Sequence, residues 1–424
     1  MSILEYVAIA TIAVTIYALA KRIETRLVLF TAGFFLCALS FDPMKALNAF
    51  ASNMTKGSLI LAICSCMGFA FVSTMTKADR SLVHYLASPI RGLGIFLIPV
   101  CTAVTFVLNI AIPSAAGCSA AVGSTLIPVM LRAGIKPAAA AAAVFGGTMG
   151  SLLSPGSAHN PFIANMAGMD MMDFIAYHTP WSISVGVISA VGLLVWCFIL
   201  GDHKGDKNAK AEVKVVDDGF KANPLMAFLT LVPILILVIG NVWVPAMKMG
   251  VAQAMVLGAV IMLVCSMVLQ RTNPQEFTKQ FFNGLGKAYG DVMGIIMAAG
   301  VFAAGLQASG LIASFVDLLK NSNEIARWGG SLGPWMMGII TGSGDAATMA
   351  FNEAVTPHAA EFGMQTHALG GLAFLTGALG RTSSPIAGAM VIVSGIAMVS
   401  PMEVVKRTAL PVFAAVVFLA LFMV

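Results

Sequence analysis

The sequence predicts an all-α polytopic membrane protein with two inverted repeats of five spans each, two re-entrant hairpins and two broken helices. Its composition is the first indication: only 10% of the 424 residues are charged, whereas an average soluble domain has about 25%. The hydrophobic fraction is 58% and the mean hydropathy is +0.91. The 24 basic and 19 acidic side chains cannot cover a soluble fold of this length. This excludes a soluble enzyme, a nucleic-acid-binding protein and a disordered chain.

Long apolar stretches are the second indication, because a bilayer span needs about 20 apolar residues. Eight stretches predict simple spans, at 3–20, 28–41, 57–76, 180–200, 224–244, 251–269, 292–311 and 408–424. Two longer stretches, 137–173 and 367–399, each carry a Ser-Pro near the middle and predict one broken span each. Short interfacial helices are expected near 77–91 and 317–327.

Two further stretches, 92–132 and 329–361, have Ser/Gly-rich centres and are interpreted as hairpins. In the second, about 14 residues precede the turn at Gly342, too few for a full span. The first could instead form two full spans. In both cases the segment 92–132 crosses the membrane an even number of times, so the orientation of the following spans is the same. With this segment as a hairpin, the total is ten spans plus two hairpins.

The distribution of Lys and Arg predicts the orientation. Eighteen of them fall on one side of this arrangement and five on the other, and Arg381 lies within the membrane. The basic side is expected inside, which places both termini outside. The polar segment 201–223 then forms a cytoplasmic linker between a first repeat, 1–200, and a second, 224–424.

The two halves also resemble each other. Ser114 aligns with Ser343 at an offset of 229 residues, and "GSLLSP" aligns with "GRTSSP" at an offset of 230. Because each half has an odd number of spans, the two halves insert with opposite topology. Inverted repeats with interrupted helices are typical of secondary transporters, whose site lies at the midplane.

The hairpin tips are the first candidate substrate site. Ser114 and Gly117 lie in one tip, and Ser343 and Gly344 lie in the other. Small residues allow backbone to approach a ligand, and hydroxyls can donate or accept hydrogen bonds. A tight helix–helix contact is the alternative interpretation.

The helix breaks at 151–160 and 381–388 are the second candidate, because proline frees a backbone carbonyl. Ser154 and Asn160 lie in the first break, where Asn160 and its neighbour His159 could equally form a structural hydrogen-bonded pair. Simple helix kinks are the alternative for both breaks.

Two ionisable residues in the predicted membrane are expected to be functional, since each costs about 2.5–3.5 kcal/mol to insert. Arg381 can bind a carboxylate through two hydrogen bonds, or form a structural ion pair with Asp345. Asp345, with Ser343 and Ser114, is the candidate site for a coupling cation, either sodium or a proton. The sequence lacks a phosphate-binding loop, hydrolase motifs and Cys/His clusters, so neither an enzyme nor a cofactor is expected.

Four motifs of the second half resemble the DcuC family of anaerobic C4-dicarboxylate carriers: "AAGVFAAGL", "TGSGDAATMAF", "GRTSSPIAG" and "SPMEVVKRTALP". The resemblance implies an elevator-type fold of the ion transporter superfamily, a homodimer, and a bacterial inner membrane. In that membrane, the orientation predicted from Lys and Arg makes both termini periplasmic. It implies transport or exchange of succinate, fumarate, malate or aspartate, coupled to protons or sodium. It also places Ser114, Ser343, Thr382 and Ser384 around substrate and ions. A carrier of the same fold for another organic anion or amino acid is the alternative.

Overall fold

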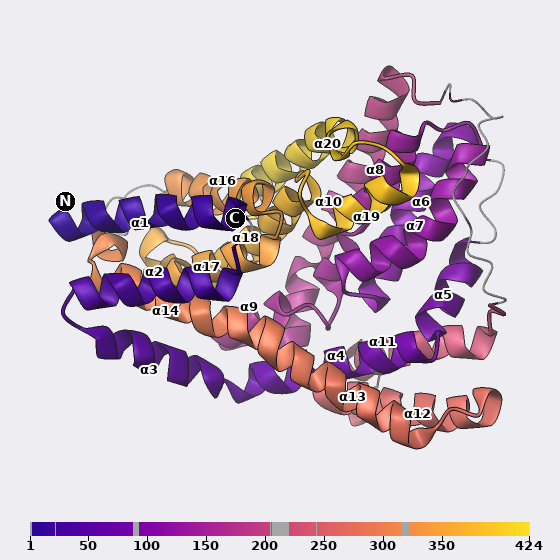
Figure 1. Ribbon diagram of the computed structural model, residues 1–424, viewed down its shortest axis with the longest axis horizontal. Helices are drawn as coiled ribbons and strands as arrows, with labels where there is room; N and C mark the ends of the chain where they lie inside the picture. Colours follow the sequence, from indigo (N-terminus) through magenta and orange to yellow (C-terminus); the bar gives the residue numbers. More distant parts are fainter. Residues whose placement is uncertain are drawn as a thin grey trace.

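The computed structural model describes residues 2–21, 23–87, 93–203, 205, 220–242, 244–314 and 323–424. Within these ranges the secondary structure is helical and contains no strand (Figure 1). Among the described residues, six helices are long and apolar enough to cross a membrane, or seven if the bent pair at 43–75 counts as one span, and five more apolar helices are shorter. The prediction of an all-helical polytopic membrane protein is confirmed, although these lengths alone do not give ten spans.

The N-terminal helices are α1 (Ile3–Ala20), α2 (Thr25–Leu39), α3 (Pro43–Met54), α4 (Gly57–Met75) and α5 (Ala78–Ala87). Helix α3 was not predicted. It begins where Asp42 accepts a hydrogen bond from the Lys45 N–H and Pro43 occupies the first helical turn, both common start signals. Helix α5 lies within the stretch near 77–91 where a short helix is expected, of which residues 88–91 lie outside the described ranges.

The first hairpin and the first interrupted stretch follow. They comprise η1 (Gly94–Phe96), α6 (Leu97–Ala111), α7 (Ala115–Arg132), α8 (Pro137–Gly147), η2 (Gly150–Leu153), α9 (His159–Ala167) and α10 (Met171–Ile199). Helix α10 begins nine residues before the span predicted at 180–200. Asp170 caps it by accepting from the Met172 N–H, and Pro180 lies inside the helix rather than at its start.

Most of the predicted linker, 204 and 206–219, lies outside the described residues. The chain then forms α11 (Pro224–Val242), η3 (Pro245–Met247), α12 (Val251–Gln270), α13 (Pro274–Ala288), the π-helical turn η4 (Tyr289–Met293) and α14 (Gly294–Ala308). Figure 1 shows α13 and α14 as one long diagonal helix. It is 35 residues long, so the span predicted at 292–311 is only its second half.

The C-terminal helices are α16 (Asn323–Thr341), α17 (Gly344–Ala354), η5 (Thr356–Phe362), α18 (Thr366–Thr382), α19 (Gly388–Ala397) and α20 (Pro401–Phe422). The predicted interfacial helix at 317–327 is described only from residue 323. Helix α20 begins before the predicted 408, because Ser400 caps it and Pro401 starts it.

Glycines bring the second hairpin against α18. A Cβ atom on Gly338 of α16 would lie 2.6 Å from the Gly377 carbonyl oxygen, and one on Gly344 of α17 would lie 2.8 Å from the same oxygen. Such close approach is typical of helices packed within membranes. Both arms of the hairpin are therefore in backbone contact with α18, just before its C-terminal end.

Candidate functional site

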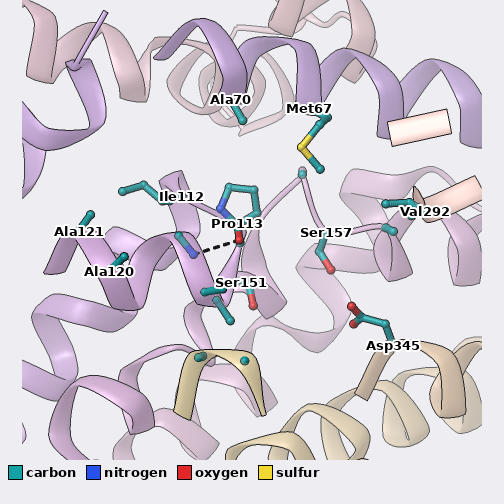
Figure 2. A pocket seen from close by; sticks show the side chains of 18 of the residues that line it. Met67, Ala70, Ile112, Pro113, Ala120, Ala121, Ser151, Ser157, Val292 and Asp345 are labelled. Carbon is teal, nitrogen blue, oxygen red and sulfur yellow. Dashed lines mark hydrogen bonds between the residues drawn. The ribbon is translucent and has the colours of Figure 1, made fainter. Parts of the chain in front are cut away.

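A cavity of about 1090 Å³ lies where the hairpin tips and the helix interruptions meet. Helix α4 lines one wall. The turns between α6 and α7, between η2 and α9, and between α16 and α17 line the others, together with the facing ends of α18 and α19. Figure 2 shows the Asp345 carboxylate pointing toward Ser157, with Met67 and Ala70 on the helix above.

Four helices begin at this cavity: α7, α9, α17 and α19. Ser114 caps α7 by accepting a hydrogen bond from the Gly117 N–H at 3.1 Å. Within the described residues, no side chain caps α9, α17 or α19. The first N–H groups of a helix lack partners inside it and carry its positive dipole end. Their convergence favours a negatively charged ligand.

Side-chain hydrogen bonds join each hairpin to the neighbouring interruption. Asn109 of α6 donates to the Ile112 carbonyl at 2.8 Å and accepts from the Ser151 N–H at 2.7 Å. In the other half, the Ser384 hydroxyl donates to the Ile339 carbonyl at 2.7 Å. The two tips are thereby held at fixed positions relative to the interruptions.

Arg381 and Asp345 both line the cavity, but they do not form the structural ion pair considered as an alternative. Among the described residues, Asp345 Oδ1 pairs with His159 Nε2 at 3.0 Å, and Arg381 Nη2 donates to the Thr148 carbonyl at 2.9 Å. The Asp345 side chain is 67% exposed in the cavity. Both charged groups therefore keep positions from which they can meet a ligand.

The structure brings six of the ten predicted site residues to the cavity wall: Ser114, Gly117, Ser343, Gly344, Asp345 and Arg381. The other four are buried and do not line it: Ser154, Asn160, Thr382 and Ser384. Their side chains bond to nearby groups, chiefly of the backbone. These hydrogen bonds shape the interruptions. Asn160 bonds to backbone carbonyls and to His178, and not to its neighbour His159, which contacts Asp345 instead.

A buried chain of hydrogen bonds behind the first interruption was not predicted. The Asn160 amide nitrogen donates to the carbonyls of Leu152 and Ser154, each at 2.9 Å, so its oxygen faces His178. His178 Nε2 donates to that oxygen at 3.0 Å, and its Nδ1 accepts from the Ser182 hydroxyl at 2.9 Å. A histidine inside an apolar span was the available signal.

The cavity extends to α5 and to the end of α13. Asp79, Arg80 and His84 line it there, together with Lys287. Burial raises the pKa of the Asp79 carboxyl, opposed by hydrogen bonds from the Arg80 N–H and the Thr74 hydroxyl. Arg80 and Lys287 thus place two cationic side chains beside the one carboxyl group of Asp79 at this end of the cavity. The described residues contain no group of three or more metal-ligating side chains.

Interrupted helices around a large cavity in a polytopic helical protein are the architecture typical of membrane transporters. The chain belongs to the DcuC family, described as C4-dicarboxylate anaerobic carrier, which matches residues 38–424. The resemblance noted in the four sequence motifs is thus confirmed.

Individual relatives agree with this family. An uncharacterized transporter of Haemophilus influenzae is 44% identical over 286 residues, covering 64% of this chain and 100% of the relative. The anaerobic C4-dicarboxylate transporter DcuC of Escherichia coli K12 is 28% identical over 374 residues, covering 85% of this chain and 78% of the relative. Neisseria gonorrhoeae MtrF, described as representing a class of antimetabolite efflux pumps, has a similar fold. Its TM-score is 0.63 at 12% identity, and the match covers 90% of this chain and 84% of that one.

Proposed function

We propose that this protein is a secondary active transporter that moves C4-dicarboxylates across the bacterial inner membrane. The observation that carries the proposal is one cavity in which four helix N-termini converge beside Arg381. Four positive dipole ends and a guanidinium suit a ligand with two carboxylates. Family membership and the name of the Escherichia coli relative support succinate, fumarate, malate and aspartate as candidates.

In this proposal, the hairpin-tip groups and Arg381 hold the carboxylates. Ser114, Gly117, Ser343 and Gly344 offer hydroxyls and backbone N–H groups at the cavity wall. Thr382, Ser384, Ser154 and Asn160 act from behind, by fixing the interruptions. Asp345, with Ser343 and Ser114, holds a coupling cation, either sodium or a proton.

The proposed transport mechanism rests on the two predicted inverted repeats. Two inverted repeats, 1–200 and 224–424, would form an elevator-type carrier that works as a homodimer, with both termini periplasmic. The similar order of elements in the two halves supports the repeats: each has a hairpin, then an interrupted helix, then a long helix. The Lys/Arg distribution supports the orientation.

The test is counterflow in proteoliposomes with labelled succinate, fumarate, malate and aspartate, over a matrix of sodium concentration and pH. Saturable exchange of at least one of them is expected. If none is exchanged, the C4-dicarboxylate assignment is wrong. The Haemophilus relative is named as a transporter without a substrate, so a carrier of another organic anion or amino acid is kept as the second candidate. A thermal melt with a panel of anions and amino acids would identify its ligand.

Arg381→Ala tests the carboxylate site. We expect binding to weaken by at least about 30-fold, the cost of removing one partner of a desolvated charge pair. Arg132→Ala is the matched control, since Arg132 ends α7 and does not line the cavity. Wild-type affinity in a folded Arg381→Ala protein would remove Arg381 from the site.

A further inference from the structure

The charges beside the hairpin tips are not all positive. Basic groups alone would give a cavity the highest affinity for a ligand with two negative charges. Asp345 nevertheless presents a carboxylate to this cavity, and its side chain is 67% exposed. Oδ1 of this carboxylate faces His159, and the described residues supply no hydrogen bond to Oδ2. Asp345 therefore offers one free carboxylate oxygen to whatever occupies the cavity.

His159 contacts only one oxygen of the Asp345 carboxylate. Its ring lies flat against Phe374, with the centroids 4.6 Å apart, and its side chain is only 5% exposed. Its Nδ1 atom is buried and has no hydrogen-bond partner among the described residues. A protonated ring would leave a buried Nδ1–H without an acceptor, which is costly. With Nε2–H donated to Asp345 Oδ1, the contact uses one carboxylate oxygen and leaves Oδ2 open to the cavity.

Arg381 supplies the opposite charge from the neighbouring helix. The described residues include no carboxylate within 4.0 Å of its guanidinium and no acceptor for Nε or Nη1. Gly344, next to Asp345, packs on the Gly377 carbonyl, and Gly377 is four residues before Arg381 on α18. Four residues of helix rise about 6 Å. One anion and one cation thus face the same cavity, about one helical turn apart.

A ligand that carries an ammonium group beside a carboxylate matches this pair of charges, and a ligand with carboxylates alone leaves Asp345 in need of a separate cation. We propose that Asp345 Oδ2 binds the ammonium group of amino-substituted dicarboxylates of the aspartate type, in the place where a coupling cation binds when the substrate lacks an ammonium. This inference rests on the proposed function. It makes the cation requirement of transport depend on the substrate.

The first test compares substrates on the wild-type protein in proteoliposomes. Uptake of labelled succinate, 2-methylsuccinate, malate and aspartate is measured over the same sodium and pH matrix. The methyl and hydroxyl compounds control for a neutral substituent at the position of the ammonium. We expect uptake of succinate, 2-methylsuccinate and malate to share one cation dependence, and uptake of aspartate to require one cation fewer. An identical cation dependence for aspartate and succinate would overturn the inference and leave the proposed function intact.

The second test uses Asp345→Asn, which keeps the shape and a hydrogen-bonding oxygen but removes the charge. We expect aspartate binding to weaken by about 10- to 100-fold, the range for losing a hydrogen bond to a charged group, while the cation dependence of succinate is lost. Asp345→Glu, which restores the charge, should recover part of the aspartate affinity. Equal weakening of aspartate and succinate would assign Asp345 to a structural role. A wild-type protein that transports none of these compounds would instead refute the proposed function.

Discussion

Replacing Arg407 with methionine should destabilise the protein more than the same replacement of the exposed Lys406, because it leaves the buried Asp202 carboxylate without its main partner. Arg407 Nε and Nη2 donate to the two oxygens of Asp202 at 2.8 and 3.0 Å, and Asp202 is fully buried. Breaking a buried ion pair from one side costs about 3–5 kcal/mol. Lys136 Nζ, 3.8 Å from the same carboxylate, remains as a partial substitute, so we expect the lower end, about 3 kcal/mol.

For a chain of this length, an unfolding entropy of about 2.1 cal/mol/K per residue converts 1 kcal/mol into about 1 °C. The Tm of Arg407→Met in detergent, followed by tryptophan fluorescence, should therefore fall by about 3 °C. Lys406→Met is the matched control: its ion pair with Glu403 is exposed, and such pairs contribute less than about 1 kcal/mol.

The cause is checked by a second substitution. Adding Asp202→Asn to Arg407→Met removes the stranded charge and should recover at least half of the lost stability. An unchanged Tm in Arg407→Met, or a double variant no more stable than the single one, would refute this reasoning.

Two further predictions concern the site. Asn109→Leu leaves the Ile112 carbonyl at the hairpin tip and the Ser151 N–H without partners, which costs about 1–3 kcal/mol for each group, so both Tm and substrate affinity should fall. A thermal melt with and without substrate measures both quantities, and an unchanged affinity would contradict the prediction. Gly344→Ala places a Cβ atom 2.8 Å from the Gly377 carbonyl oxygen and should reduce substrate uptake severalfold in a folded protein. Gly286→Ala is the control, because a Cβ atom there meets open space, and equal uptake by both variants would exclude a packing role for Gly344.

The sequence was sufficient where local chemistry decides the structure. Scarce charge and long apolar stretches predict a polytopic helical protein, and Ser-Pro pairs mark the places where α8–η2 and α18 end. Helix starts are less predictable from the sequence. The spans predicted to begin at 180 and 408 begin earlier, at Met171 and Pro401, because Asp170 and Ser400 cap the two helices.

The candidate site was predicted in part for the same reason. Residues of the hairpin tips were identified because small residues and membrane-embedded charges are visible in the sequence. The partner of Asp345 was not, since His159 lies 186 residues away along the chain and only the packing of α9 against α17 brings them together. The role of His178 likewise depends on the orientation of the Asn160 amide, which no local pattern specifies.

The contacts of Gly377 have a consequence for how the cavity can change. A single peptide carbonyl is the point at which α16, α17 and α18 meet, with no side chain between them. Side chains can switch rotamers to absorb small displacements, but backbone packed on backbone has no such freedom. A ligand that pulls on the tip at Ser343 therefore displaces α18, and Arg381 with it. Ligand binding at the tip and the position of the Arg381 guanidinium are therefore expected to change together.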